Sequence, residues 1–316
     1  MSKGQFFAIT REGWSRACEL GLNPAVAYLV QSCGTGRDNV TTSWSAEAVA
    51  NYSGMSWRRA KTAIETLVSA GETTQSGSRT RPKYKIHRSK KDEDLIWLPN
   101  ALVTAASDES PPIYRLRQTR ELEVLQTFIE LYGEQDLAGD GGIPRRLLYQ
   151  NYERSKIMDM GQFVVYGFTR PEQIWCRYDG PLARFRGRKE GTAWERLNAM
   201  QNLGLIEWVH YLAEDSEHDA ELIHALDGDE HAEEVAECLS MATECLPGGF
   251  DYEAELYDVV VPVIRHIERA AVVTVARLRY RPRTSLTSAW YARHVESSRE
   301  FADLYRRIAR GELRAA

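Results

Sequence analysis

One stretch constrains the fold more than any other, SWRRAKTAIETLVSAG at residues 56–71, because its apolar residues recur at helical spacing. Ser56 has the chemistry of an N-cap, and Gly71 that of a residue that ends a helix. The apolar residues on one face are Ala60, Ile64, Leu67 and Val68. The opposite face and its flank hold Arg58, Arg59, Lys61, Thr62, Glu65 and Thr66, whereas Trp57, at the helix start, is expected near the apolar face. The pattern predicts a helix that buries one face and presents cations to solvent.

The sequence on either side predicts a second helix and a hairpin. Upstream, TTSWSAEAVANYSGM supplies a short extended piece, a helix capped by Ser45, and a glycine turn, which is a helix-turn-helix layout. Downstream, ETTQSGSRTRPKYKIHRSKK predicts two strands with a turn at 76–78, the second alternating lysine with Tyr84 and Ile86. The cations of this hairpin are Arg79, Arg81, Lys83, Lys85, Arg88, Lys90 and Lys91.

A helix-turn-helix followed by a basic hairpin resembles the winged-helix DNA-binding domain over roughly residues 5–91. The resemblance implies that the second helix enters the major groove and that the hairpin, the wing, contacts the backbone. Cations there can pair with guanine edges or phosphates. The predicted DNA-binding residues of this domain are Trp57, Arg58, Arg59, Lys61, Thr62, Arg79, Arg81, Lys83, Lys85 and Arg88. The alternative is a solvated cationic face, or a winged helix that docks onto protein.

The formal net charge of −5 conceals separated blocks of charge. Residues 1–91 hold 14 Lys/Arg and 6 Asp/Glu, a net of +8. No Lys or Arg occurs between Arg196 and Arg265, whereas 12 basic residues face 5 acidic ones from Arg265 onward. A basic N-terminal region of this kind is typical of proteins that bind polyanions.

Residues 113–212 contain a partial echo of the first domain. TAWERLNAMQNLGLIEWVHYL matches the helix and first strand of residues 59–77, and GGIPRRLLYQNY matches TTSWSAEAVANY. We therefore expect a second winged-helix-like domain, with an insertion at about 151–188 that contains strands FVVYGF and IWCRY. Its helix carries no outward Lys or Arg, and its predicted DNA contacts are Arg186, Arg188 and Lys189 just upstream.

The remaining segments are a connector at 92–112, an acidic segment at 213–256 and a C-terminal region at 257–316. The last shows two helical patterns, predicted as an antiparallel pair joined near Arg283. Arg277, Arg279, Arg281 and Arg283 form a second predicted basic patch, either a backbone contact or the partner of the acidic segment. The expected fold class is thus mainly α with small β-hairpins (α+β), with two winged-helix domains and a C-terminal helical region.

Several function classes are excluded by pattern. His210, His218, His224 and His231 lie among the carboxylates of the acidic segment, but their spacing fits no metal motif, so we expect a solvated acidic face that repels DNA or docks a basic protein. CGTGRDN at 33–39 lacks the ending of a phosphate loop and is predicted to be a turn. No catalytic motif is present, and neither a metal nor a cofactor is expected. The absence of a membrane span or signal peptide, with five cysteines in no CxxC, predicts a cytoplasmic protein.

Two winged-helix units in one chain resemble the replication initiators of plasmids and phages and related mobile-element regulators. That resemblance implies a sequence-specific double-stranded DNA-binding protein, not an enzyme, acting as initiator or transcriptional regulator, with a homodimer as one possibility. The alternative is a protein-interaction factor, such as a mobile-element inhibitor of a host complex that docks through its acidic segment. A nuclease is a third, more distant hypothesis.

Overall fold

The computed structural model describes residues 5–78, 81–87, 94–105, 110–172, 174–189, 191–226, 232–247, 256–281 and 284–313. The chain divides into two compact units, and each draws on separate parts of the sequence. Unit 1 comprises Met1–Glu134, Gly187–Leu205 and Arg279–Pro282. Unit 2 comprises Gln135–Arg186, Ile206–Leu278 and Arg283–Ala316.

Unit 1 is mostly helical. Its helices are α1 (Arg11–Glu19), α2 (Leu22–Cys33), α3 (Ala46–Ser53), α4 (Trp57–Ser69), α5 (Ala101–Thr104), α6 (Pro112–Gln118), α7 (Leu122–Tyr132) and α8 (Thr192–Asn202). Its strands are β1 (Phe6–Thr10), β2 (Thr41–Thr42), β3 (Thr73–Ser78), β4 (Arg81–Ile86) and β5 (Leu95–Pro99). Helices α6 and α7 are separated near Arg120, whose φ is +60°. The expected connector at 92–112 supplies β5, which pairs with β1.

Helix α4 forms as its periodicity predicts. Ser56 is the N-cap, and its hydroxyl accepts a hydrogen bond from the Arg59 amide. Ala60, Ile64 and Leu67 are buried against the rest of the unit. Gly54 ends α3 in the left-handed region with φ +67°, which makes the tight turn between the two helices.

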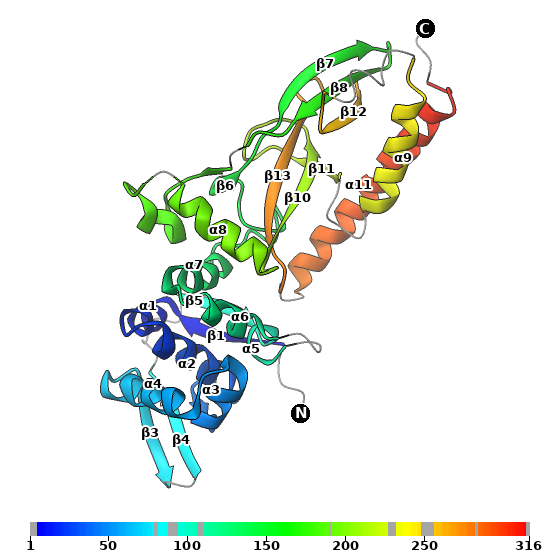
Figure 1. Ribbon diagram of the computed structural model, residues 1–316. Helices are drawn as coiled ribbons and strands as arrows, with labels where there is room; N and C mark the ends of the chain where they lie inside the picture. The colour runs from blue at the N-terminus through cyan, green and yellow to red at the C-terminus, as the bar shows by residue number, and fades with distance from the viewer. Residues whose placement is uncertain are drawn as a thin grey trace. The chain divides into compact units, whose positions relative to one another are not determined.

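The hairpin after α4 belongs to a three-stranded antiparallel sheet in the order β2-β4-β3. Strands β3 and β4 pair from Thr73↔Ile86 to Ser78↔Arg81, so residues 76–78, predicted as the turn, belong to the strand. Figure 1 shows the hairpin extending from the helices of unit 1. Tyr84 and Ile86 are buried as the alternation predicts, and this holds the base of the hairpin on the unit.

Unit 2 is built mainly from antiparallel strands. They are β6 (Leu148–Tyr149), β7 (Glu153–Asp159), β8 (Phe163–Thr169), β9 (Trp175–Cys176), β10 (Ile206–Ala213), β11 (Leu222–Ala225), β12 (Val259–Ile264) and β13 (Ala271–Leu278). Its helices are the 3-10 turn η1 (Gly180–Phe185), α9 (Ala232–Glu244) and α11 (Ser285–Ala309). The sheets have the orders β11-β10-β13, β12-β8-β7 and β6-β9.

The core of unit 2 lies between its sheets and the two long helices. Helices α9 and α11 run alongside each other (Figure 1). Phe168 of β8, Val261 of β12 and Tyr305 of α11 are fully buried in one cluster. Thr284 and Thr287 form a reciprocal capping box that starts α11.

The fold class is α+β, and the expectation of a mainly α protein is wrong: 42% of the described residues are helical and 26% extended. The prediction fails most clearly at the first of the two helices expected at 257–316. That segment forms strands β12 and β13. Both segments are rich in β-branched residues, and all eight residues of β13 are buried. A continuous apolar run of this kind fits a buried strand and a buried helix equally well by periodicity.

The second winged-helix domain is also not found. Residues 141–152 were matched to the extended piece and first helix of the helix-turn-helix at 41–52. They contain a turn and β6 where that match predicts a helix. The predicted helix α8 is present, and so are the predicted strands β8, β9 and β10. However, α8 belongs to unit 1, while β10 lies in unit 2 between β11 and β13 and makes no wing.

Candidate nucleic-acid interface

The outer face of α4 is an exposed cationic helix surface of unit 1. Arg58, Arg59 and Thr62 all lie on the solvent side of the helix. Trp57, expected near the apolar face, is 58% exposed at the helix start. The Thr62 hydroxyl donates to the carbonyl oxygen of Arg58 at 3.1 Å, which leaves its lone pairs directed outward as acceptors.

Lys61 is held by two neighbours on the same helix. Its Nζ lies 5.6 Å from the centre of the Trp57 ring and 3.6 Å from Oε1 of Glu65. Both contacts are exposed, so water screens them and neither stabilises the fold strongly. Lys61 can therefore exchange these partners for a ligand anion at little cost.

Hairpin β3–β4 presents cations and hydroxyl groups on one side. Because side chains alternate along a strand, Arg81, Lys83 and Lys85 share a face. Their cross-strand partners are Ser78, Ser76 and Thr74 respectively, whose hydroxyls can also bond phosphate oxygens. We call these six residues the hairpin face. All of them are exposed. The sequence did not identify its serines and threonine, because the register depends on where the turn falls.

The hairpin face is rigidly supported from the side of unit 1. Tyr84 is buried between Lys83 and Lys85, and burial raises the pKa of its hydroxyl. At the start of β3, the carboxylate of buried Glu72 lies 2.9 Å from Nε of Arg16 on α1. Burial raises the pKa of Glu72, and Arg16 opposes that rise by stabilising the charged form. These contacts fix the hairpin relative to the helices of the same unit.

Five cations of α4 and the hairpin face are without an anionic partner. Among the described residues, none of the following forms an ion pair: Arg58, Arg59, Arg81, Lys83 and Lys85. Other arginines of the described chain do pair with carboxylates, as Arg11 does with Asp94 at 2.9 Å. The interface therefore carries uncompensated positive charge, which is the electrostatic requirement for binding phosphates.

The other predicted contacts lie elsewhere. Arg79 and Arg88 fall outside the described residues. Arg186 belongs to unit 2 and pairs with Asp179 at 3.1 Å, and Arg188 pairs with Glu123 in unit 1 at 2.6 Å. Lys189 is exposed, and its ammonium group has no ion-pair partner among the described residues. The structure thus brings together the α4 and hairpin residues in one unit and leaves Arg186 in the other.

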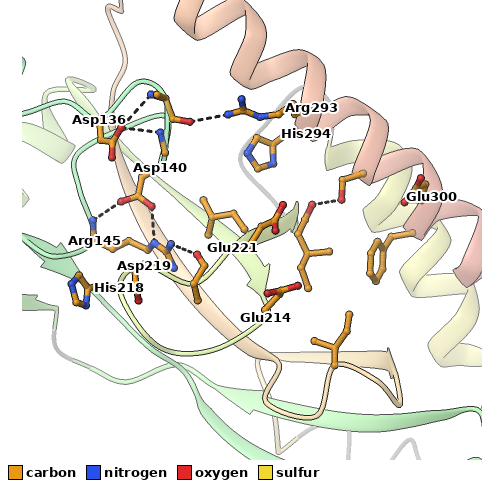
Figure 2. Close-up of a pocket in the computed structure, with 18 of the residues that line it drawn as sticks. Asp136, Asp140, Arg145, Glu214, His218, Asp219, Glu221, Arg293, His294 and Glu300 are labelled. Carbon is orange, nitrogen blue, oxygen red and sulfur yellow. Dashed lines mark hydrogen bonds and ion pairs between the residues drawn. The ribbon is translucent and has the colours of Figure 1, made fainter.

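Unit 2 contains a cavity of about 950 Å³, shown in Figure 2. One wall is fixed by a buried ion pair between Nε of Arg145 and Asp140, 2.8 Å apart. The rim carries exposed carboxylates of Glu214, Asp219 and Glu221 from the predicted acidic segment. Among the described residues, the side-chain carboxylates of these three have no hydrogen-bond or ion-pair partner and are exposed to solvent, so they form an acidic edge and not a closed site.

The histidines of the acidic segment do not converge. His224 is fully buried, His218 is exposed at the cavity, and His231 lies outside the described residues. No group of three His, Cys, Asp or Glu side chains within the described ranges could hold a metal ion.

The second predicted basic patch, around Arg277, does not exist as one surface. Arg277 is 1% exposed, and its guanidinium lies 4.6 Å from the centre of the Trp290 ring and 5.2 Å from that of Tyr211. Arg279 is exposed in unit 1, and Arg283 lies outside the described residues. Burial of Arg277 follows from its place in β13, where the sequence pattern predicted a helix.

Comparison of the chain with protein families, with characterised proteins and with solved structures gives no match. Within the described ranges, no helix combines the length and apolar character needed to cross a bilayer.

Proposed function

We propose that the protein is a sequence-specific double-stranded DNA-binding protein, not an enzyme, that acts in the cytoplasm as a replication initiator or transcriptional regulator of a plasmid, phage or mobile element. The observation that carries the proposal is the set of five cations on α4 and the hairpin face that lack an ion-pair partner among the described residues. Exposed, uncompensated cations on two neighbouring elements supply the positive charge that binding to backbone phosphates requires.

The order of elements supports assigning residues 22–86 to a single winged-helix module. Helix α2 is followed by β2, the pair α3 and α4, and the hairpin, with β4 between β2 and β3. In a module of this kind α4 is the helix that enters the major groove, and the hairpin is the wing.

The two elements have different roles in this proposal. Arg58, Arg59 and Thr62 on α4 have the donors and acceptors that discriminate base edges in the major groove. The hairpin face supplies cations and hydroxyls that contact the backbone, and such contacts carry no sequence information of their own. Trp57, exposed at the N-terminal end of α4, would lie against the sugar-phosphate backbone at the groove edge.

Selection of bound duplexes from a random pool tests sequence specificity. The proposal predicts a recovered motif of defined sequence that binds at least 1,000-fold more tightly than random duplex, on the order of other specific DNA-binding proteins. An inverted repeat would indicate a homodimer, and iterated direct repeats would indicate an origin. A pool that shows no enrichment after selection contradicts sequence-specific recognition.

A protein-interaction factor is the second candidate, favoured by the acidic cavity edge of unit 2. Glu214, Asp219 and Glu221 would there bind a basic partner protein, and the helix-hairpin module would be a scaffold. The two functions respond to different variants. Replacing the three carboxylates with glutamine or asparagine would abolish capture of a stoichiometric partner from nuclease-treated extract, whereas DNA binding would be lost only on neutralising α4 and the hairpin face.

A further inference from the structure

Two aromatic side chains of unit 2 stand exposed next to each other. Tyr149 of β6 and Trp175 of β9 are directly opposite in the antiparallel register, so they project from the same face about 5 Å apart at Cβ. Their exposed fractions are 36% and 57%. Neither side chain has a hydrogen bond or ring contact with any other described residue. Both rings therefore have faces open to a planar ligand.

Residues on the opposite face of the β6–β9 ladder anchor the backbone that carries Tyr149 and Trp175. Leu148 is fully buried and pairs with Cys176, whose thiol has its pKa raised to about 11 by burial. The ladder continues with a bond of 2.9 Å from the Arg177 amide to the Leu147 carbonyl. The aromatic pair thus stands on an anchored backbone and is not on a free loop.

The uncovered ring of Trp175 differs from that of another exposed tryptophan, Trp97. Trp97 in unit 1 is 46% exposed, but Phe6 covers its ring in an edge-to-face contact with centroids 5.5 Å apart. Trp175 has no such cover. Tyr178, another 36% exposed ring, follows it by three residues and also has no hydrogen-bonding or ring partner for its side chain among the described residues.

The surroundings of the pair are cationic. Along the sequence, residues 144–186 hold eight Lys/Arg and four Asp/Glu, although one of the eight, Arg145, is buried in its ion pair with Asp140. Arg177 and Arg186 have side chains 66% and 70% exposed and share the single carboxylate of Asp179. Arg146, which directly precedes Leu147, is exposed and has no ion-pair partner among the described residues. An apolar protein partner would leave these charges uncompensated, whereas a polyanion with planar groups compensates them.

We propose that this surface binds single-stranded DNA, with unpaired bases stacking on Tyr149 and Trp175 and backbone phosphates lying against Arg146 and Arg177. Bases of a duplex are already stacked on one another and cannot occupy such a platform, so the strand must be single. The choice of DNA over RNA rests on the proposed function. The aromatic platform and its cations do not depend on that function.

The test is fluorescence anisotropy of a labelled 15-nucleotide oligo-dT against the full chain at low salt. Trp175→Ala and Tyr149→Ala should each weaken binding by roughly 5- to 150-fold, the range for removing one stacking ring. Trp97→Ala, an equally large change at the covered tryptophan of unit 1, should leave the affinity within about twofold. Circular dichroism melting of each variant establishes that it is folded, and the double variant Arg146→Gln/Arg177→Gln should weaken binding without removing a ring.

Other outcomes overturn the proposal. The proposal is wrong if the chain does not bind oligo-dT at low salt. It is also wrong if Trp97→Ala weakens oligo-dT binding as much as Trp175→Ala does. Tighter binding of oligo-U than of oligo-dT contradicts the assignment to DNA. Self-association that requires Trp175, without binding of any oligonucleotide, assigns the surface to a second copy of the chain. Failure of the duplex-binding proposal is separable, because Arg58→Gln/Arg59→Gln should reduce the discrimination between duplex sequences and retain oligo-dT binding.

Discussion

His224 and Tyr305 are joined by a hydrogen bond in the core of unit 2, with 2.9 Å between Nε2 of the ring and the hydroxyl oxygen. Both residues are fully buried. Nδ1 of His224 lies 3.1 Å from the carbonyl oxygen of Ala225, which can only accept. The neutral ring therefore carries its proton on Nδ1 and accepts the hydroxyl proton at Nε2. Burial lowers the pKa of His224 to about 4.

This burial predicts that unit 2 loses stability as the pH falls from about 6.5 towards 4. In that window the unfolded chain protonates His224, at an ordinary pKa near 6.5, while the folded chain does not, so the free energy of unfolding decreases with falling pH. The slope from this residue is at most about 1.4 kcal/mol per pH unit, and it vanishes above pH 6.5. Urea unfolding at a series of pH values measures it. His224→Gln should flatten the slope, and a variant that retains the full wild-type slope contradicts this account.

Removing one partner of the Asp140–Arg145 pair should strongly destabilise unit 2. The two side chains are buried and 2.8 Å apart, so Arg145→Met leaves a carboxylate in a low dielectric environment. The expected loss is about 3–5 kcal/mol, and the double variant Asp140→Asn/Arg145→Met should recover part of it. Arg269→Met is the matched control, because Arg269 is 73% exposed beside Asp215 and its loss should change the free energy of unfolding by less than about 1 kcal/mol. Equal effects at the two arginines would be inconsistent with the burial described.

Gly54→Ala should destabilise the turn between α3 and α4. A Cβ at Gly54 would lie 2.1 Å from Cε2 of Tyr114, and the backbone has φ +67°. Gly71→Ala is the comparison, since φ is +79° there and no atom lies within 4 Å of the added Cβ. The left-handed backbone alone costs about 1–2 kcal/mol in both variants, and the clash adds to it only at Gly54. Thermal unfolding should place Gly54→Ala well below Gly71→Ala, and the reverse order would contradict the packing of Tyr114 on this turn.

Removing charges from helix α4 and from the hairpin face should have different effects on duplex binding. Arg58→Gln/Arg59→Gln should reduce the ratio of specific to random-duplex affinity by about 10- to 100-fold, because base contacts are lost. Lys83→Gln/Lys85→Gln should weaken all duplexes alike. Arg310→Gln, which removes one exposed charge at the end of α11 in unit 2, is the control and should have no effect. Equal effects of all three on the ratio would rule out α4 as the element that discriminates bases.

Residues 45–86 were predicted from the sequence nearly element by element. Helix α4 and strand β4 each have one buried and one exposed face, so periods of 3.6 and 2 are visible in their residues. Ser56 marks the helix start through its side-chain hydroxyl, and Gly71 marks the helix end through its left-handed backbone. Only the hairpin turn was misplaced, by a few residues, because Ser76 to Ser78 have turn-forming composition but pair as strand.

Unit 2 could not be predicted in the same way. Strand β13 is buried along its whole length and so has no alternation, and Pro262 was assigned to a helix although it lies in β12, an edge strand where its missing N–H is tolerated. Tyr149 and Trp175 are neighbours only through strand register, which local pattern does not give. The acidic cavity edge likewise depends on how separate strands and α11 pack.

The most direct test of the central claim is the affinity of the full chain for random-sequence duplex DNA across a series of salt concentrations. If all five unpaired cations of α4 and the hairpin face contact phosphates, the logarithm of the association constant should fall linearly with the logarithm of salt, with a slope of about −4 to −5. Lys83→Gln/Lys85→Gln should reduce the magnitude of that slope by about 2. Absence of binding at low salt, or an affinity indifferent to salt, would contradict the account.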